Sequence, residues 1–519
     1  MVQFRLNGNI VDSPEGKTIM ETAAENGLPI PSMCFLDHTN HIPSCMICIV
    51  RDNSTGKLIP ACSTRIEPGM DICTEDEEIS EARKTALELF LSDHVGDCDA
   101  PCQTNCPAYM DIPMMNRLLA AGRIGEALRV VKRDIALPAV LGRICPAPCE
   151  RACRRRDVDE AVSICHLKRY AADADLLLDE PFLPNIAPVT GRQIAIVGTG
   201  PAGLSAAYFL LQKGYGCILF DKNPLPGGAL RYAIPDDRLD KSILDMEIAL
   251  ISRMGAVFNM NQPVGQDALH GLMKSFDSVI IATGESDASF SGLSKRSKSF
   301  VTERYTHQTS IPGVFAIGSA IKPGRVAIRA VAHGKEVAHA VHQYLNNEKI
   351  TGEYRMFNSR FGRLLHEEID EYVRESIHNP RVSTKGTEGF TRDAMITEAS
   401  RCMHCDCRKK EDCKLRIYSD TYEAVQKRYF PDERKPVRKI FKNKPVVYEP
   451  EKCIKCGICV RITSRNREKL GLTFIGKGFD VEIGVPFDQD GLNALERTGE
   501  LCAMNCPTGA LSVYEKQDE

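Results

Sequence analysis

The stretch RQIAIVGTGPAGLSAAYFLLQKG, at residues 192–214, determines the architecture of the middle of the chain. Its apolar run IAIV predicts a buried strand, and the apolar spacing after the turn predicts a helix. The turn carries the fingerprint G-x-G-x-x-G, in which glycines permit a tight bend and let a pyrophosphate approach the helix N-terminus. The sequence therefore predicts a Rossmann-like dinucleotide site whose turn residues are Gly198, Gly200, Pro201, Ala202 and Gly203.

The residues that follow extend this site. The next apolar segment, CILF, ends at an acid placed to accept hydrogen bonds from ribose hydroxyls. We place an α/β region at residues 190–350. It is completed by the segments PLPGGALRYAIP, IIATGES and TSIPGVFAIGSA. The further binding residues are Asp221, Lys222, Gly227, Gly228, Thr283, Gly284, Gly318 and Ser319.

Cysteine is the outlier of the composition, with 22 in 519 residues and no signal peptide in view. In a reducing cytosol such density indicates metal binding rather than disulfides. The cysteines crowd into four groups, and residues 166–401 hold only Cys217. The formal net charge of −3 and the lack of a long apolar run predict a cytoplasmic chain with no membrane span and no nucleic-acid partner.

The first cysteine group lies in residues 1–80, which open with the alternating segment VQFRLNG and predict a β-hairpin followed by a short helix. Its spacing is C-x10-C-x2-C-x13-C. One close pair with two outlying thiolates suits a 2Fe–2S cluster, whereas a zinc site favours two tight pairs. The predicted ligands are Cys34, Cys45, Cys48 and Cys62.

The second group lies in residues 81–185, where helical patterning is broken by Cys-Pro pairs. Eight candidate ligands, enough for two 4Fe–4S clusters, occur in three segments. The segments are HVGDCDAPCQTNCP, ICPAPCERACRR and SICHLKRYAAD. His94 is either the first of these ligands or a histidine satisfied at the surface. The candidates are His94, Cys98, Cys102, Cys106, Cys145, Cys149, Cys153 and Cys165.

Two more groups lie in the last third of the chain. Residues 351–435, charged and helical, contain RCMHCDCRKKEDC, for which we favour a 4Fe–4S cluster over a zinc site. Residues 436–519 contain CIKCGICV and CAMNCPTGAL, which suffice for one 4Fe–4S cluster and leave Cys502 over. The predicted ligands are Cys402, Cys405, Cys407 and Cys413 in the former and Cys453, Cys456, Cys459 and Cys506 in the latter.

These regions resemble modules of known redox families. Residues 1–80 resemble the β-grasp 2Fe–2S domain of the large iron–sulfur subunits of respiratory complex I and iron-only hydrogenases. The resemblance rests on the segments IPSMC, PSCMICIV and IPACST. Residues 436–519 resemble the two-cluster ferredoxin module of the same proteins, with half of its cysteines replaced. The resemblance thus implies a mosaic of electron-transfer modules.

The second cysteine group and the dinucleotide region resemble the small subunit of glutamate synthase and the large subunit of NADH-dependent ferredoxin:NADP oxidoreductase, which implies bound FAD. That family usually has a cysteine at the position of His94 and Gly-Asp at the position of Gly318-Ser319. Carried over by position, its pattern implies two clusters. One would be held by His94, Cys98, Cys102 and Cys153, and the other by Cys106, Cys145, Cys149 and Cys165.

Such flavoenzymes insert a second Rossmann unit for NAD(P)H between the segments that contain Gly284 and Gly318. Here Gly318 follows Gly284 by 34 residues, with no glycine fingerprint between them. Since a βαβ unit alone needs about 30 residues or more, the NAD(P)H domain is predicted to be missing.

Together these features predict a multidomain chain of α+β and α/β modules: a β-grasp 2Fe–2S domain, a helical two-cluster domain, a Rossmann-like FAD domain without its NAD(P)H domain, and a C-terminal ferredoxin-like module. The cofactors would be one FAD, one 2Fe–2S cluster and about four 4Fe–4S clusters. No general acid, base or nucleophile stands out, so no catalytic side chain is predicted.

We therefore expect an electron-transfer subunit of a multisubunit NAD(P)-linked oxidoreductase, one form of which is an electron-bifurcating complex. The expected partners are an NADH-oxidising FMN and iron–sulfur subunit, a catalytic oxidoreductase subunit, or both, with ferredoxin as a further partner. Two alternatives are a self-contained NAD(P)H-dependent reductase and a zinc-binding assembly scaffold.

Overall fold

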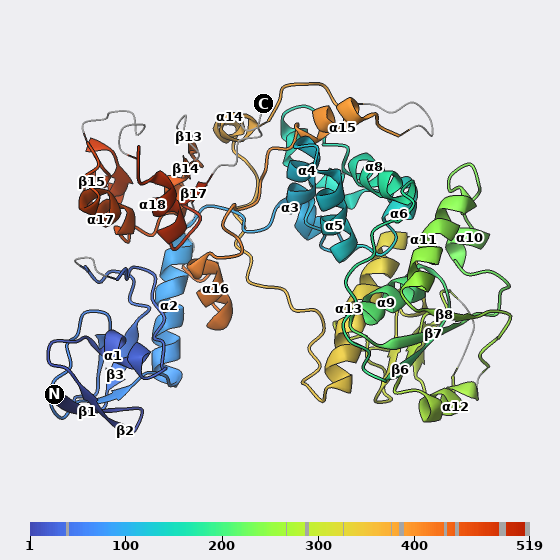
Figure 1. Cartoon of the computed structure of the whole chain (residues 1–519), viewed down its shortest axis with the longest axis horizontal. Helices are drawn as coiled ribbons and strands as arrows, with labels where there is room; N and C mark the ends of the chain where they lie inside the picture. Colours follow the sequence, from blue (N-terminus) through green and yellow to red (C-terminus); the bar gives the residue numbers. More distant parts are fainter. Residues whose placement is uncertain are drawn as a thin grey trace. The chain divides into compact units, whose positions relative to one another are not determined.

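The computed structural model describes residues 1–37, 41–265, 267–285, 290–324, 326–374, 376–382, 389–429, 433–441, 446–486 and 495–513 (Figure 1). The chain forms two compact units, each assembled from separate stretches of sequence. Unit 1 comprises Met1–Asp99, Met356–Arg374 and Cys405–Glu519, and unit 2 comprises Ala100–Arg355 and Glu375–His404. The chain thus crosses between units four times, and the linear domain boundaries given above stay predictions.

Unit 1 begins with a five-stranded mixed sheet in the order β2-β1-β5-β3-β4. The first two strands form the hairpin that the alternating sequence predicts, with Phe4 opposite Val11. Helix α1 (Ile19–Glu25) starts at a capping box between Thr18 and Glu21 and contributes to the sheet's apolar core. The strands are β1 (Val2–Leu6), β2 (Asn9–Ser13), β3 (Ile49–Asp52), β4 (Lys57–Pro60) and β5 (Asp71–Cys73).

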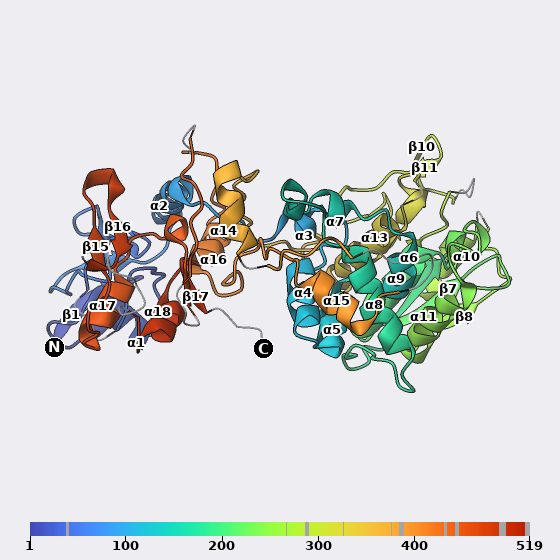
Figure 2. The same cartoon turned by 90° about the horizontal axis from the view of Figure 1, so that it is seen from above.

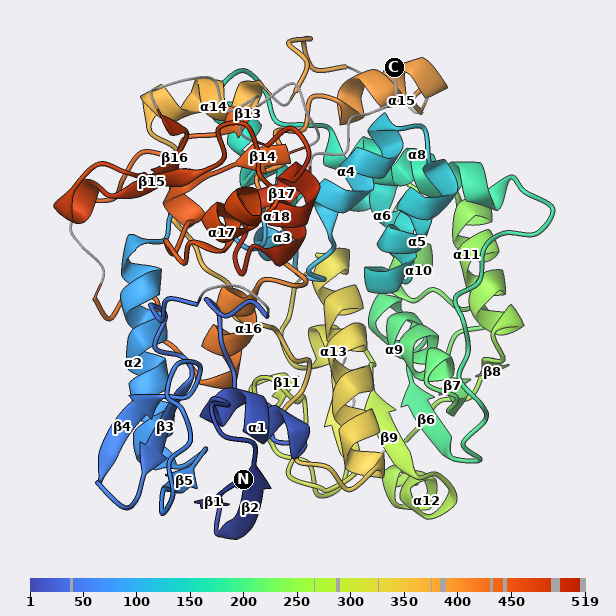
Figure 3. The same cartoon turned by 60° about the vertical axis from the view of Figure 1, so that its left-hand side comes forward.

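Helix α2 (Glu77–Asp93) leads from this sheet to His94 (Figure 3). Its buried Leu87 and Leu91 pack with Met33 and Leu415 in a core that also contains cysteine side chains. This unit also contains the small sheet β13-β14-β17 and the hairpin β15–β16, which lies beside α17 (Figure 2). These and the other elements of unit 1 are η3 (His366–Glu368), α14 (Ile369–Val373), α16 (Lys414–Thr421), β13 (Ile440–Phe441), β14 (Val446–Tyr448), η4 (Pro450–Lys452), α17 (Ile458–Arg465), β15 (Thr473–Ile475), η5 (Gly478–Asp480), β16 (Glu482–Gly484), α18 (Gly499–Asn505) and β17 (Leu511–Val513).

Unit 2 contains the predicted Rossmann-like sheet, five parallel strands in the order β12-β9-β6-β7-β8. Helices α9 (Pro201–Gln212) and α13 (Ala327–Leu345) pack closely, since a Cβ on Gly334 would lie 2.6 Å from the Cβ of Ser205. The strands are β6 (Gln193–Val197), β7 (Gly216–Phe220), β8 (Val257–Asn259), β9 (Ser278–Ile281) and β12 (Val314–Ala316).

The rest of unit 2 consists mostly of short helices, two of which begin with proline and are capped at the C-terminus by a cysteine. Their apolar faces make one core that also includes Val331 of α13. The elements are α3 (Pro101–Asn105), α4 (Ile112–Ala120), α5 (Ile124–Asp134), α6 (Pro138–Ile144), α7 (Pro148–Arg151), η1 (Arg154–Asp157), α8 (Ile164–Leu176), α10 (Ala229–Tyr232), α11 (Lys241–Arg253), α12 (Ala268–Ser275), β10 (Lys295–Arg296), β11 (Ser299–Phe300), η2 (Gly318–Ala320) and α15 (Arg392–Ala399). In neither unit does a helix of the described residues have the length and apolar character to cross a membrane.

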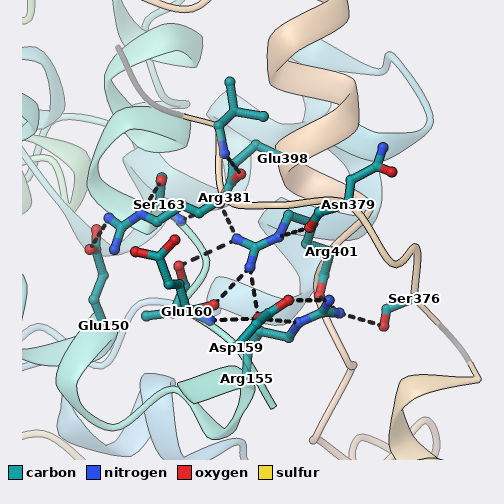
Figure 4. A network of polar contacts seen from close by, with 12 residues as sticks. Glu150, Arg155, Asp159, Glu160, Ser163, Ser376, Asn379, Arg381, Glu398 and Arg401 are labelled. Atoms are coloured by element: carbon teal, nitrogen blue, oxygen red, sulfur yellow. Dashed lines mark hydrogen bonds and ion pairs between the residues drawn. The ribbon is translucent and has the colours of Figure 1, made fainter. Parts of the chain in front are cut away.

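A buried network of ion pairs fixes the chain that follows α15 (Figure 4). Arg401 is fully buried and donates to Glu398 and to Asp159, each at 2.9 Å. Arg155 binds the other oxygen of Asp159 at 2.7 Å and also donates to the Arg401 carbonyl oxygen at 3.2 Å. The segment is therefore fastened beside the loop that carries Cys153.

We expect Arg401→Ala to lower the free energy of unfolding of unit 2 by about 3–5 kcal/mol, because the fully buried Glu398 carboxylate would lose its cation. Urea unfolding followed by circular dichroism measures the change. The matched control is Arg156→Ala, which removes an exposed guanidinium and should change stability by no more than about 0.5 kcal/mol. Equal effects of the two substitutions would contradict the role assigned to the network.

Candidate functional site

The four thiols of the first cysteine group are all buried on the loops around β3. The sulfurs of Cys48 and Cys62 lie 3.2 Å apart, and the backbone N–H of Met33 donates to Cys45 Sγ at 3.5 Å. Hydrogen bonds from Cys45 and Cys62 hold the pKa of Cys34 well below its usual range. Close thiols, one of them easily ionised, and an amide directed at sulfur fit a 2Fe–2S cluster.

In unit 2, Cys106, Cys145, Cys149 and Cys165 converge on one buried ammonium group, that of Lys168. Burial lowers the pKa of Lys168, but its interactions with all four thiols outweigh this effect and raise it above the usual value. A hydrogen bond with Cys165, aided by the Lys168 charge, lowers the pKa of Cys145 to about 6. The thiols that the sequence assigns to one 4Fe–4S cluster thus surround a single cation, which fits a group that carries negative charge.

The C-terminal cysteines Cys453, Cys456, Cys459 and Cys506 line one small pocket whose other walls are mainly apolar. Burial, followed by the charges of the other three thiols, raises the pKa of Cys459. Four thiols around one dry pocket fit the 4Fe–4S cluster predicted here, because metal binding displaces the thiol protons that burial otherwise retains.

Two predicted ligand sets are divided between the units, so they remain predictions. Within the described residues, no three His, Cys, Asp or Glu side chains form a site for a single metal ion. Support for clusters therefore comes from the thiol neighbourhoods and from similarity to known families. The members in unit 1 are His94, Cys98, Cys405, Cys407 and Cys413. The members in unit 2 are Cys102, Cys153 and Cys402.

The glycine turn between β6 and α9 is packed too closely for side chains. Gly198 has φ +112°, and a Cβ there would lie 2.3 Å from the Ala282 carbonyl oxygen. A Cβ on Gly203 would lie 2.0 Å from the carbonyl oxygen of Gly198, and one on Gly228 would lie 2.7 Å from the Cα of Gly200. The turn therefore presents bare backbone at the N-terminus of α9, which fits the pyrophosphate of a dinucleotide.

Asp221, at the end of β7, has hydrogen-bond partners within the protein. Its carboxylate accepts from the backbone N–H and the hydroxyl of Thr199 at 2.8 and 2.7 Å, and from the N–H of Asn223 at 3.0 Å. The acid therefore fixes the glycine turn, and its contact with a ribose stays a prediction.

The remaining predicted dinucleotide residues follow strand ends of the same sheet. The Thr283 hydroxyl, just after β9, is buried and has no hydrogen-bond partner among the described residues. Gly318, after β12, has φ +66° and donates its N–H to His333 Nδ1 at 3.1 Å. Ser319 donates to the Gly324 carbonyl oxygen at 3.1 Å, whereas Lys222 is exposed beside Asp221. Parallel strands bind nucleotides at their carboxyl ends, so these positions suit the predicted site.

Three family models match parts of the chain. The 2Fe-2S iron-sulfur cluster binding domain matches residues 1–77. Dihydropyrimidine dehydrogenase domain II, 4Fe-4S cluster, matches residues 63–178, and the NAD(P)-binding Rossmann-like domain matches residues 196–252. The predicted 2Fe–2S module, the 4Fe–4S module that follows it and the Rossmann-like module are thereby confirmed, while the two C-terminal cysteine groups stay predictions.

Curated relatives are oxidoreductase subunits. The NADP(+)-dependent formate dehydrogenase subunit beta of Moorella thermoacetica is 40% identical over 207 residues, which are 36% of this chain and 29% of the relative. The NADPH-Fe(3+) oxidoreductase subunit beta of Geobacter sulfurreducens is 35% identical, over 44% of this chain and 37% of the relative. The glutamate synthase [NADPH] small chain of Bacillus subtilis is 37% identical, over 36% and 40%. The predicted resemblance to glutamate synthase small subunits is confirmed, although the chain spans less than half the length of each relative.

Two side chains that lie next to thiols were not predicted from the sequence. Lys168 follows Cys165 by three residues, one turn along α8, and this spacing was a usable signal. His41 Nε2 lies 2.9 Å from Cys62 Sγ, a contact across 21 residues that no local spacing rule predicts.

We expect Lys168→Met to lower the reduction potential of the cluster held by Cys106, Cys145, Cys149 and Cys165, by on the order of 100 mV. The reduced cluster carries more negative charge and would lose its buried cation. A redox titration monitored by electron paramagnetic resonance (EPR) measures the shift, and Lys168→Arg, which retains the charge, should titrate close to the wild type. An unchanged potential in the Met variant would show that the ammonium group does not act on a cluster.

We expect Gly203→Ala to weaken FAD binding about tenfold or more, because the added methyl would overlap the Gly198 carbonyl oxygen and displace the turn. Reconstitution of flavin-free protein, followed by flavin fluorescence, measures the affinity. Gly125→Ala, in α5 with open space around it, should bind FAD like the wild type. Full FAD affinity in the Gly203 variant would place the flavin elsewhere.

Proposed function

We propose that the chain is the FAD- and iron–sulfur-containing electron-transfer subunit of a multisubunit NAD(P)-linked oxidoreductase. The observation that carries this proposal is the presence of 2Fe–2S, 4Fe–4S and Rossmann-like domains in one polypeptide. A bound flavin exchanges one or two electrons and an iron–sulfur cluster exchanges one, so together they collect, divide and relay electrons. The residues of the chain would hold these groups and set their potentials.

The short interval between Gly284 and Gly318, which belong to the last two predicted FAD-binding segments, favours an electron relay over a complete NAD(P)H reductase. The described residues between Gly284 and Gly318 form β10, β11 and β12, and no βαβ unit occurs among them. An NAD(P)H domain would need at least one such unit. We therefore propose that electrons enter through clusters or through a partner.

The partners follow from the relatives. Two of these are beta subunits by name, one of an NADP(+)-dependent formate dehydrogenase and one of an NADPH-Fe(3+) oxidoreductase. By analogy, we propose a catalytic oxidoreductase subunit, an NADH-oxidising FMN and iron–sulfur subunit, or both, with ferredoxin as a further electron carrier.

Anaerobic titration of the cluster-loaded chain with NADH and NADPH tests the proposal, with bleaching of flavin and clusters followed by absorbance. We expect slow or no bleaching by either nucleotide alone, and prompt bleaching once a candidate NADH-oxidising subunit is added. Prompt bleaching by a nucleotide alone would overturn the relay and establish a self-contained reductase. Zinc in place of iron in the purified protein would instead support the scaffold alternative.

A further inference from the structure

Two cysteine groups that the sequence keeps apart come together in unit 1. The backbone N–H of Cys407 donates to the carbonyl oxygen of Cys98 at 3.0 Å, across more than 300 residues of sequence. The Cys98 and Cys413 thiols each interact electrostatically with the Cys407 thiol. The buried thiols of Cys98, Cys407 and Cys413 are therefore neighbours. Cys98 precedes the stretches of chain that form unit 2, and the other two follow them.

Contacts on both sides of this junction hold it in place. Asp99, the last residue before the chain leaves unit 1, binds Arg416 at 2.7 Å, and both side chains are buried. The N–H of Asp99 also donates to Asn358 Oδ1 at 3.0 Å. Cys98 is thus positioned by the same segment that carries Cys413.

His94 supplies the fourth candidate donor. The next residue, Val95, donates its N–H to the carbonyl oxygen of Glu451 at 3.0 Å. The His94 ring is hydrogen-bonded to the backbone of Lys452. The other ring nitrogen, Nδ1, is buried and has no hydrogen-bond partner among the described residues. A histidine ligand commonly uses one nitrogen for a backbone carbonyl and presents the other to the metal.

Lys452 lies next to both His94 and Cys407, and Gly509 lies next to Cys407. A Cβ on Gly96, two residues after His94, would lie 2.7 Å from Lys452 Cε, and the Lys452 charge interacts with Cys407. A Cβ on Gly509 would lie 2.3 Å from Cys407 Sγ, so the loop after Cys506 approaches this thiol as closely as bare backbone allows.

We propose that one 4Fe–4S cluster is held by His94, Cys98, Cys407 and Cys413. Two of these ligands precede the stretches of chain that form unit 2, and two follow them. The inference rests on the proposed function only in taking iron–sulfur clusters as the bound groups. It replaces the two ligand sets that the sequence pattern implies for these residues.

The regrouping assigns Cys402 to a different site, in unit 2. The Cys402 thiol is hydrogen-bonded with the Asn116 side chain and interacts electrostatically with the Cys153 thiol. The network around Arg401 fastens this segment beside the Cys153 loop. Cys402 and Cys407 therefore serve separate clusters, although only four residues lie between them.

Iron content of paired variants decides between the two groupings. The loaded wild type should contain about 18 iron atoms, and each single variant Cys98→Ala or Cys407→Ala should lose about four. On the proposed grouping, the double variant Cys98→Ala/Cys407→Ala also loses about four, whereas Cys402→Ala/Cys407→Ala loses about eight. A loss of about eight in the first pair and about four in the second would overturn the proposal. Cys73→Ala, outside every ligand set, is the control and should lose none.

Pulsed EPR provides a second test that does not depend on alanine variants folding. Protein labelled with ¹⁵N-histidine should show a ¹⁵N coupling to one reduced 4Fe–4S cluster, and His94→Cys should abolish it while iron content is retained. Absence of the coupling in the wild type, or its persistence in the variant, would overturn the role of His94. Because both tests count or label ligands, they are independent of the electron donor, and the failure of nucleotide titration would leave their outcome unchanged.

Discussion

Two buried arginines fix the chain close to where it passes between the units. In unit 1, Arg416 pairs with Asp99, and in unit 2, Arg401 pairs with Glu398 and Asp159. A buried guanidinium is stable only when its donors are satisfied, so each arginine allows essentially one placement of its segment. The positions of the neighbouring cysteines, and hence the ligand sets, depend on these pairs.

Buried lysines complement the thiols in both units. Lys168 interacts with four thiols in unit 2, and in unit 1 Lys452 interacts with the thiol of Cys407. Thiolates in a medium of low dielectric constant are stabilised by nearby cations, which also raise the potential of any cluster they hold. A net charge of −3 for the whole chain conceals this local pairing.

The sequence predicted what short spacings encode. Some predictions depend on residues that are close in sequence or on a known motif. These are the glycine turn, the hairpin of β1 and β2, and the ligand sets built on Cys-x-x-Cys pairs. The structure brings the residues of each together. The sequence did not predict the two-unit division, because the contact of Cys98 with Cys407 spans a whole inserted unit. Local spacing grouped Cys402 with Cys407, whereas the structure assigns these two residues to different units.

The apolar cores explain how each unit would serve a relay. In unit 1, one core contains Cys34, Cys45 and Cys413, and Cys456 packs against it, so members of three predicted ligand sets share one apolar interior. In unit 2, the core around Cys106 and Cys149 includes Val331 of α13, the helix that packs on the dinucleotide turn through α9. Electron tunnelling weakens steeply with distance, and a shared core keeps donors and acceptors close and excludes water. Unit 1 carries no glycine fingerprint of its own, so in the proposed relay its clusters would exchange electrons with other cofactors.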